Sequence, residues 1–212
     1  MKCGNMENIM MRNRINRQSY VKYLMLNIPK CIFFIFDKKN HTYIHIHKYY
    51  ILMISFFLYK DLNSRCNQLI DITCIDFFLQ KKRFEIIYQY LSHEFHRRIF
   101  LKFFISELES VNSIINEFPN SSWYEREIWD LFGVYFIHNK YLKRIMLDYG
   151  FIGHPLRKDF PLTGFLEVAY SYFFSTVVHK KVNLSQSFRK FETVSNWSTL
   201  NSSFQGKAIK RK

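Results

Sequence analysis

Glycine and proline are scarce in this sequence: its 212 residues include six glycines and four prolines. Half of these residues lie between positions 150 and 164. Glycine permits positive φ angles, and proline fixes φ and removes a hydrogen-bond donor. The segment 150–164 is therefore expected to form one loop of defined shape, because the rest of the chain has few residues that break helices or strands.

Cysteine is also rare, and its four positions match no metal-binding motif. Cys3, Cys31, Cys66 and Cys74 form no C-x-x-C pair. Zinc sites and iron–sulfur clusters need thiolates that converge. The pattern favours reduced structural thiols, and disulfides are not expected in a reducing compartment.

Long apolar segments are absent. The longest run covers positions 49–59, eleven residues, whereas a membrane-spanning helix needs about 20. The N-terminal region has Arg12, Arg14 and Arg17 but also Glu7, and it lacks an apolar core followed by a cleavage site. We therefore expect no membrane crossing, and an organelle-encoded protein would need no transit peptide.

Alanine occurs twice, whereas Phe, Ile, Lys, Asn and Tyr are abundant. Codons of the abundant residues are rich in A and T, which suggests an organellar gene. Hydrophobic residues make up 48% and aromatic residues 19% of the chain, ample for a core. A chain of this length is typical of a single domain, and such a domain buries roughly 70% of the surface that its unfolded chain exposes.

Acidic residues are outnumbered: 31 Lys and Arg against 17 Asp and Glu give a net charge of +14. Such a charge attracts nucleic acid, anionic lipid or an acidic partner. Much of it lies at the ends, in positions 12–22 and 207–212. Two interpretations of this charge are possible, solvated tails and a basic docking surface, because net charge alone does not identify a binding partner.

Alternating and aromatic-rich segments predict strands at positions 41–47, 69–78, 83–91 and 97–105, and the apolar segment 48–63 predicts a helix packed on them. The predicted fold class is α+β, with a mixed β-sheet and packed helices. A basic N-terminal extension (1–20), an α+β domain (21–150) and an extended loop and tail (151–212) are the expected domains.

Two Ser-x-x-Glu capping boxes predict helix starts. The box at 106–109 would open a helix that Pro119 closes, and the box at 122–125 would open a helix that Gly133 ends. A third, short helix is predicted at 140–148. In the second helix the predicted apolar stripe consists of Tyr124, Ile128, Leu131 and Phe132, and the acidic residues are expected to point away from this stripe. In the third helix the residues expected to be buried are Leu142, Ile145 and Met146.

Two contiguous blocks, residues 125–133 (EREIWDLFG) and 148–162 (DYGFIGHPLRKDFPL), closely resemble the signature of the 30-kDa subunit family of respiratory complex I, the proton-pumping NADH:ubiquinone reductase. Weaker similarity extends the match to roughly two thirds of the chain. Asn139 departs from the family pattern, which has His or Lys after the first block.

The resemblance implies a non-catalytic core subunit of the peripheral matrix arm of complex I, at the mitochondrial inner membrane. It implies no cofactor in this chain, with FMN, iron–sulfur clusters, NADH and ubiquinone bound elsewhere in the assembly. The implied partner is the hydrogenase-related, 49-kDa-type subunit at the quinone site, which the extended C-terminal segment would wrap. Neither nucleic-acid binding nor membrane association outside the complex is implied.

The resemblance also implies structural and interfacial roles for the charged, glycine and proline residues of the signature. No catalytic residue is expected among them. The expected signature and interface residues are Glu125, Arg126, Glu127, Asp130, Arg144, Asp148, Gly150, Gly153, His154, Pro155, Arg157, Lys158, Asp159 and Pro161.

Within the signature helix, Glu127 and Asp130 could form an acid–base pair or share a metal. Arg126 and Asp130, at i and i+4, have the spacing of a helix-surface ion pair. No histidine has a zincin spacing, since His93 and His96 are one residue too close. Structural pairing or a subunit contact is the favoured interpretation.

The loop 154–159 offers Arg157 to a carboxylate. An anchor on a neighbouring subunit is the favoured interpretation, and an internal brace is the alternative; His154 is expected to form hydrogen bonds. The three histidines at 41, 45 and 47 share one strand face, but no carboxylate or cysteine accompanies them, so solvent-facing histidines are favoured over a metal site.

Two rival functions remain. An organellar RNA-binding or ribosomal protein would explain the charge and the aromatic strands. A carboxylate-dependent hydrolase would use Glu127. Neither explains the two long signature blocks.

Overall fold

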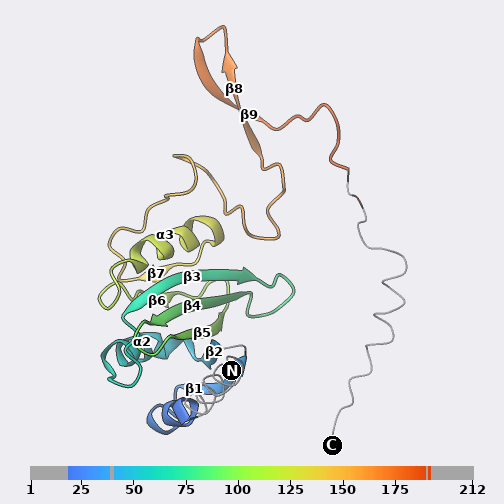
Figure 1. Cartoon of the computed structure of the whole chain (residues 1–212). Coiled ribbons are helices and arrows are strands. Elements are labelled where there is room, and N and C mark those ends of the chain that lie inside the picture. Colours follow the sequence, from blue (N-terminus) through green and yellow to red (C-terminus); the bar gives the residue numbers. More distant parts are fainter. Residues whose placement is uncertain (1–18, 39–40, 190, 192–212) are drawn as a thin grey trace, which may run out of the picture. The chain divides into compact units, whose positions relative to one another are not determined.

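A computed structural model of the chain describes residues 19–38, 41–189 and 191 (Figure 1). It divides into two compact units, Met1–Gly164 and Phe165–Lys212. The predictions for the N-terminal arginines, for Cys3 and for the tail from residue 192 lie outside the described residues.

A five-stranded sheet in the order β1-β2-β5-β4-β3 forms the first unit. All neighbours are antiparallel except β2 and β5, which are parallel. The sheet is therefore mixed and the fold is α+β, as predicted. The four predicted strands are present, and β1 is an additional strand. The bounds are β1 Ile32–Lys38, β2 His41–Ile46, β3 Gln68–Asp76, β4 Phe84–Ser92 and β5 Arg97–Ile105.

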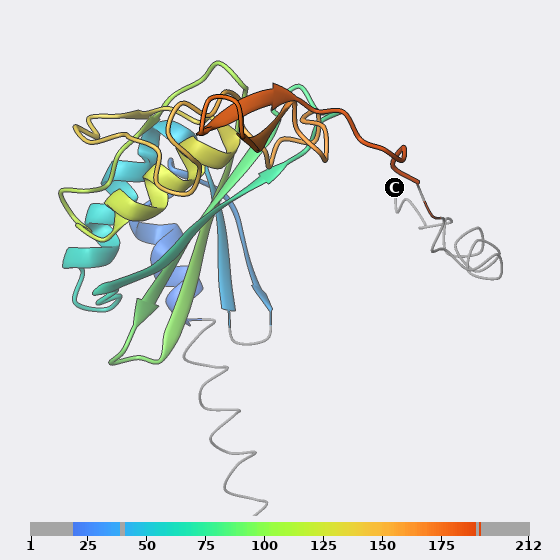
Figure 2. The same cartoon turned by 90° about the horizontal axis from the view of Figure 1, so that it is seen from above.

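Helices gather on one side of this sheet (Figure 2). They are the helical residues 19–27, the 3₁₀ turn η1 (Lys48–Tyr50), α2 (Ile51–Lys60) and α3 (Ser121–Phe132). Tyr90 on β4 points toward this side of the sheet: its hydroxyl is 2.7 Å from Ser55 Oγ of α2, and its ring packs against Phe118, which precedes α3. Alternate residues of the strands thus enter one core, each side chain stabilising the fold by about 1.5–3 kcal/mol.

The predicted helix at 106–119 is absent, which is a correction. The chain instead forms turns and β6 (Val111–Asn112), which pairs in parallel with β7 (Phe136–Ile137). Glu109 does accept the Ser106 N–H at 3.2 Å, as in a capping box, but the same residues close a turn. The segment forms a strand rather than the predicted helix because Val111 donates its N–H to Tyr135 O of the neighbouring segment.

The second unit contains one antiparallel hairpin, β8 (Leu166–Ser171) with β9 (Thr176–Lys181). One face of the hairpin carries the apolar residues Leu166, Val168, Tyr170 and Val177, all of which are more than half exposed. In the described part of the chain no helix has the length and apolar character needed to span a membrane.

Candidate functional site

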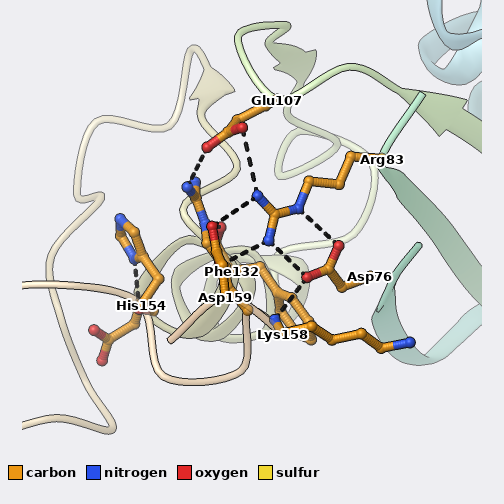
Figure 3. Close-up of polar contacts among 9 residues, drawn as sticks. Asp76, Arg83, Glu107, Phe132, His154, Lys158 and Asp159 are labelled. Atoms are coloured by element: carbon orange, nitrogen blue, oxygen red, sulfur yellow. Dashed lines mark hydrogen bonds and ion pairs between the residues drawn. The ribbon is translucent and has the colours of Figure 1, made fainter. Parts of the chain in front are cut away.

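Arg83 is the centre of an ion-pair network beside the signature loop (Figure 3). It directly precedes β4, and Asp76 ends β3, so the antiparallel register brings them together. Arg83 Nε and Nη2 donate to the two carboxylate oxygens of Asp76, both at 2.8 Å. Their side chains are 8% and 1% exposed. The pair is therefore a buried, bidentate one, and Arg83 also stacks over the Phe84 ring.

The signature loop joins this pair from 76 residues away in the sequence. Arg83 Nη2 and Nη1 donate to Asp159 Oδ1 and Oδ2 at 2.8 and 3.1 Å. The Lys158 N–H donates to Asp76 Oδ2 at 2.8 Å. One arginine thus holds two carboxylates, one from the sheet and one from the loop.

Arg157 connects the same loop to the end of α3 and to Glu107. Its Nε donates to Phe132 O at 2.6 Å, at the end of α3. Its Nη1 pairs with Glu107, whose other carboxylate oxygen lies 3.5 Å from Arg83. The internal brace, the less favoured of the two sequence interpretations, is therefore present; the anchor on another subunit stays a prediction.

Gly133 makes this close approach possible. It has the left-handed φ of 79° and ends α3, as predicted. A Cβ at this position would lie 2.5 Å from Arg157 Nη2 and 2.7 Å from the His154 ring. The signature therefore needs glycine here for both conformation and space.

Asp130 organises the next part of the signature from within α3, where it is 0% exposed. Its Oδ1 accepts a bond from Arg144 Nη1 at 2.6 Å, and its Oδ2 accepts three consecutive backbone N–H groups, those of residues 145–147. Because those amides point at one carboxylate, the helix predicted at 140–148 does not form. Met146, predicted to be buried, is exposed.

The predicted surface pair between Arg126 and Asp130 is also absent. Arg126 Nε donates to Lys143 O at 3.0 Å instead, because Asp130 faces inward toward Arg144. Glu127 is half-buried, and it shares none of the hydrogen bonds of Asp130. The Asp130 carboxylate bonds to Arg144 and to the amides of residues 145–147, and the described contacts show no bond between it and Glu127.

Glu125 is 0% exposed, which contradicts both its predicted capping role and the expectation that acidic residues point away from the core. Its carboxylate accepts the Ile114 N–H and the Asn139 Nδ2 amide, each at 3.0 Å. The helix begins with Asn120 as N-cap and Ser121 as first residue, without a side-chain cap. Asn139, the departure from the family pattern, is thus a buried partner of the signature.

The pKa values of these carboxyl groups shift in different directions. Hydrogen bonds from Arg83 lower the pKa of Asp76 and of Asp159. Burial alone would raise the pKa of Asp130, but the Met146 N–H, Arg144 and the neighbouring amides lower it overall. Burial raises the pKa of Glu125. Asp130 is held in its ionised form, and of Asp76, Asp130 and Glu125 it is Glu125 that takes up a proton most readily.

The remaining signature residues shape the loop. His154 Nδ1 lies 2.9 Å from Asp130 O, the hydrogen-bonding role expected of it. Gly153, at φ 116°, packs against the Phe160 ring. Pro155 and Pro161 are half-buried, whereas Asp148 and Gly150 are exposed.

Sequence reasoning missed Asp76, Arg83 and Glu107. Arg83 lay within the weaker stretch of family similarity, but its partners could not be inferred from spacing. The available signal was a pair of oppositely charged residues, Asp76 and Arg83, on either side of the break between the predicted strands 69–78 and 83–91, because antiparallel pairing of those strands would bring the two residues together.

No metal site forms from the described residues, since no three His, Cys, Asp or Glu side chains converge on one point. The predicted solvent-facing histidines 41, 45 and 47 are half-buried instead, since rings cover them; His45 stacks on Phe34 at 4.0 Å. The cysteines at 31, 66 and 74 are free thiols. Burial raises the pKa of Cys66 to about 12, so it is an inert core residue.

Known proteins resemble this chain over most of its length. NADH-ubiquinone oxidoreductase subunit 9 of Prototheca wickerhamii is 37% identical over 84% of this chain and 93% of its own. Subunit 9 of Reclinomonas americana is 40% identical over 84% of this chain and 86% of its own. NADH dehydrogenase [ubiquinone] iron-sulfur protein 3 of Beta trigyna is 38% identical over 88% of this chain and 98% of its own.

The name of the third relative mentions an iron–sulfur protein. The described thiols of this chain do not fit such a group, because they do not converge and Cys66 is fully buried.

A chain in the structure of the membrane-bound sulfane sulfur reductase, an archaeal respiratory membrane complex, has the same fold, with a TM-score of 0.59 and 20% identity over 68% of this chain and 85% of its own. The family profile described as "Respiratory-chain NADH dehydrogenase, 30 Kd subunit" matches residues 44–166, which include both signature blocks down to Leu162. The chain therefore belongs to the 30 Kd subunit family of the respiratory-chain NADH dehydrogenase.

Proposed function

We propose that this chain is a structural subunit in the peripheral arm of a respiratory NADH:ubiquinone oxidoreductase. Family membership and relatives named as subunits of that enzyme support the proposal. The observation that supports the structural role is that charged residues in and beside the signature bond within the chain: Arg83, Asp130 and Arg157 each hold two segments of the chain together. Catalysis and proton translocation would belong to the assembly.

The second unit is proposed to dock on a neighbouring subunit, the hydrogenase-related subunit of the quinone site. An isolated two-stranded hairpin is marginally stable in water. Here Tyr172 and Phe173 at its turn are each 90% exposed, and Val168 on its apolar face is 60% exposed. Packing against a partner would remove this exposed apolar surface from water and stabilise the hairpin. The exposure therefore supports the proposal that this segment wraps a neighbouring subunit.

The finer assignments follow from the same proposal. The complex would lie on the matrix side of the mitochondrial inner membrane, and FMN, iron–sulfur clusters, NADH and ubiquinone would bind to other subunits. The boundaries at residues 20 and 150, the interface role of the signature and the anchor at Arg157 remain parts of this proposal. No observation favours RNA binding.

A native gel of gently solubilised inner membranes tests the assignment. The gel is stained for NADH dehydrogenase, and mass spectrometry locates this chain and the hydrogenase-related subunit. Both are expected in the active band. Migration of this chain with ribosomes, or alone, would contradict the assignment.

A further inference from the structure

The sheet of the first unit has two unlike faces. The helices of residues 19–164 lie on one side (Figure 2), over Ile44, Ile99 and Leu101, which are at most 1% exposed. Tyr43 and Phe100 alternate with those residues in β2 and β5, so their side chains are on the other side. Both remain partly exposed.

Aromatic rings form a continuous layer on this second side. Phe36 stacks on Tyr43 with ring centroids 4.7 Å apart, and Tyr43 stacks on Phe100 at 4.8 Å. Phe34 and Phe36, on the edge strand β1, are 51% and 40% exposed. We call this surface the open face; its residues are Phe34, Phe36, His41, Tyr43, His45, Arg98, Phe100 and Lys102.

A hollow of about 340 Å³ lies at one end of the open face. Phe34 and His45 of the open face line it together with Tyr49 and Phe104. Its size suits one large side chain of a bound segment, as an anchor residue fills a pocket at an interface.

The charges of the open face are positive. On the same side of the sheet, Glu85 is 6% exposed and lies 3.8 Å from Lys102, and Asp71 lies on β3, two strands away from Phe100. Glu109, which lines the hollow, pairs with Lys48 at 3.1 Å. Arg98 is exposed on the open face and has no carboxylate partner among the described residues. A guanidinium in this position can bind a carboxylate bidentately.

We propose that the open face is a docking surface for an acidic polypeptide segment of another subunit, which lays apolar side chains on the rings and a carboxylate on Arg98. The proposal rests on the proposed function, since it takes the partner from the same complex. An acidic protein segment fits better than nucleic acid, because binding a run of phosphates would need more cations than Arg98 and Lys102, which are the lysine and arginine residues of the open face.

Charge reversal at Arg98 gives the sharpest test. Full-length chains carrying Arg98→Glu or the matched control Lys81→Glu, an exposed loop residue, replace the native chain in the organelle. The share of each in the active NADH dehydrogenase band is then measured by mass spectrometry. We expect Arg98→Glu to lower that share about fivefold, because like charges across an interface are strongly unfavourable, and Lys81→Glu to leave it unchanged.

A second pair of variants covers the case in which charge reversal disturbs folding. Phe36→Ser removes a ring of the open face, and Leu79→Ser changes a 95% exposed turn residue outside it. Both free chains should keep their unfolding midpoints, and only Phe36→Ser should reduce incorporation. Equal incorporation of Phe36→Ser and Leu79→Ser would overturn the proposal.

Zero-length carbodiimide cross-linking of the purified complex identifies the occupant. Lys102 is expected to join an Asp or Glu of another subunit. Cross-links of Lys102 to this chain alone, including the hairpin at 166–181, would overturn the proposal while leaving the proposed function intact. Absence of the native chain from the active band would overturn both.

Discussion

The signature loop and the C-terminal hairpin reverse the usual placement of charged and apolar side chains. In the loop region, Asp76, Arg83 and Asp130 are buried and fully hydrogen-bonded. In the hairpin, Val168 and Phe173 are exposed. Charged residues that resemble a functional site therefore stabilise the fold of the first unit, and apolar residues that resemble a core form a surface. The first unit is expected to be stable by itself, and the hairpin is expected to depend on a partner.

The largest effect is expected for Arg83→Ala, which leaves the Asp76 carboxylate buried without its cation. Losing one partner of a buried pair costs about 3–5 kcal/mol. Asp159→Ala should cost about 1 kcal/mol or less, because its side chain is 44% exposed and solvent screens the pair. Urea unfolding of the full chain measures the loss of unfolding free energy for both variants. Equal losses would contradict the larger contribution assigned to the buried pair of Arg83 and Asp76.

Gly133→Ala should have the next largest effect. Alanine is strained at φ 79° by about 1–2 kcal/mol, and its Cβ would displace Arg157 and His154. Gly150→Ala is the matched control, because Gly150 has a φ of 73° but nothing lies within 4 Å of a Cβ there. Thermal unfolding should show a clearly larger decrease for Gly133→Ala. Similar decreases for both would mean that the tight contact with Arg157 is unimportant.

Glu125 predicts a pH effect of smaller size. Because burial raises its pKa, the folded state binds a proton more readily than the unfolded state. Its contribution to the unfolding free energy therefore falls as pH rises from the ordinary glutamate range through the raised pKa. Glu125→Gln stays neutral, so the difference in unfolding free energy between variant and wild type should shift in favour of the variant as the pH rises above the ordinary glutamate pKa of about 4.3. A difference independent of pH would contradict the raised pKa.

The smallest effect on stability is expected at the hairpin. Phe173→Ser and Val168→Ser remove exposed apolar side chains, and such changes usually alter the unfolding free energy by less than about 0.5 kcal/mol. Incorporation into the complex should nevertheless fall, because these side chains are proposed to pack on another subunit. Urea unfolding of the free chain and quantitative native gels measure the two quantities. Normal incorporation would contradict the proposed docking.

Strands were predictable because β-branched and aromatic residues in the segments 69–78, 83–91 and 97–105 carry a local signal. The edge strand β1 was missed, although its sequence IFFIFDK has the same composition. The signature helix and its end at Gly133 were predicted from local patterns.

Three of the errors share a physical cause, because in each a carboxylate bonds to a part of the chain outside its own helix or loop. Glu125 takes the Ile114 N–H instead of capping its own helix. Asp130 takes three amides of residues 145–147, which breaks the helix predicted there. The pairing of Arg83 with Asp159 spans 76 positions, so no local pattern could indicate it.

Hydrogen exchange of the full chain, alone and in the purified complex, tests the difference between the two regions most directly. Amides of β4 and β5 are expected to exchange slowly in both states, since they lie in the centre of the sheet. Amides of β8 and β9 should exchange rapidly in the free chain and slowly in the complex. Slow exchange of the hairpin in the free chain would contradict its dependence on a partner.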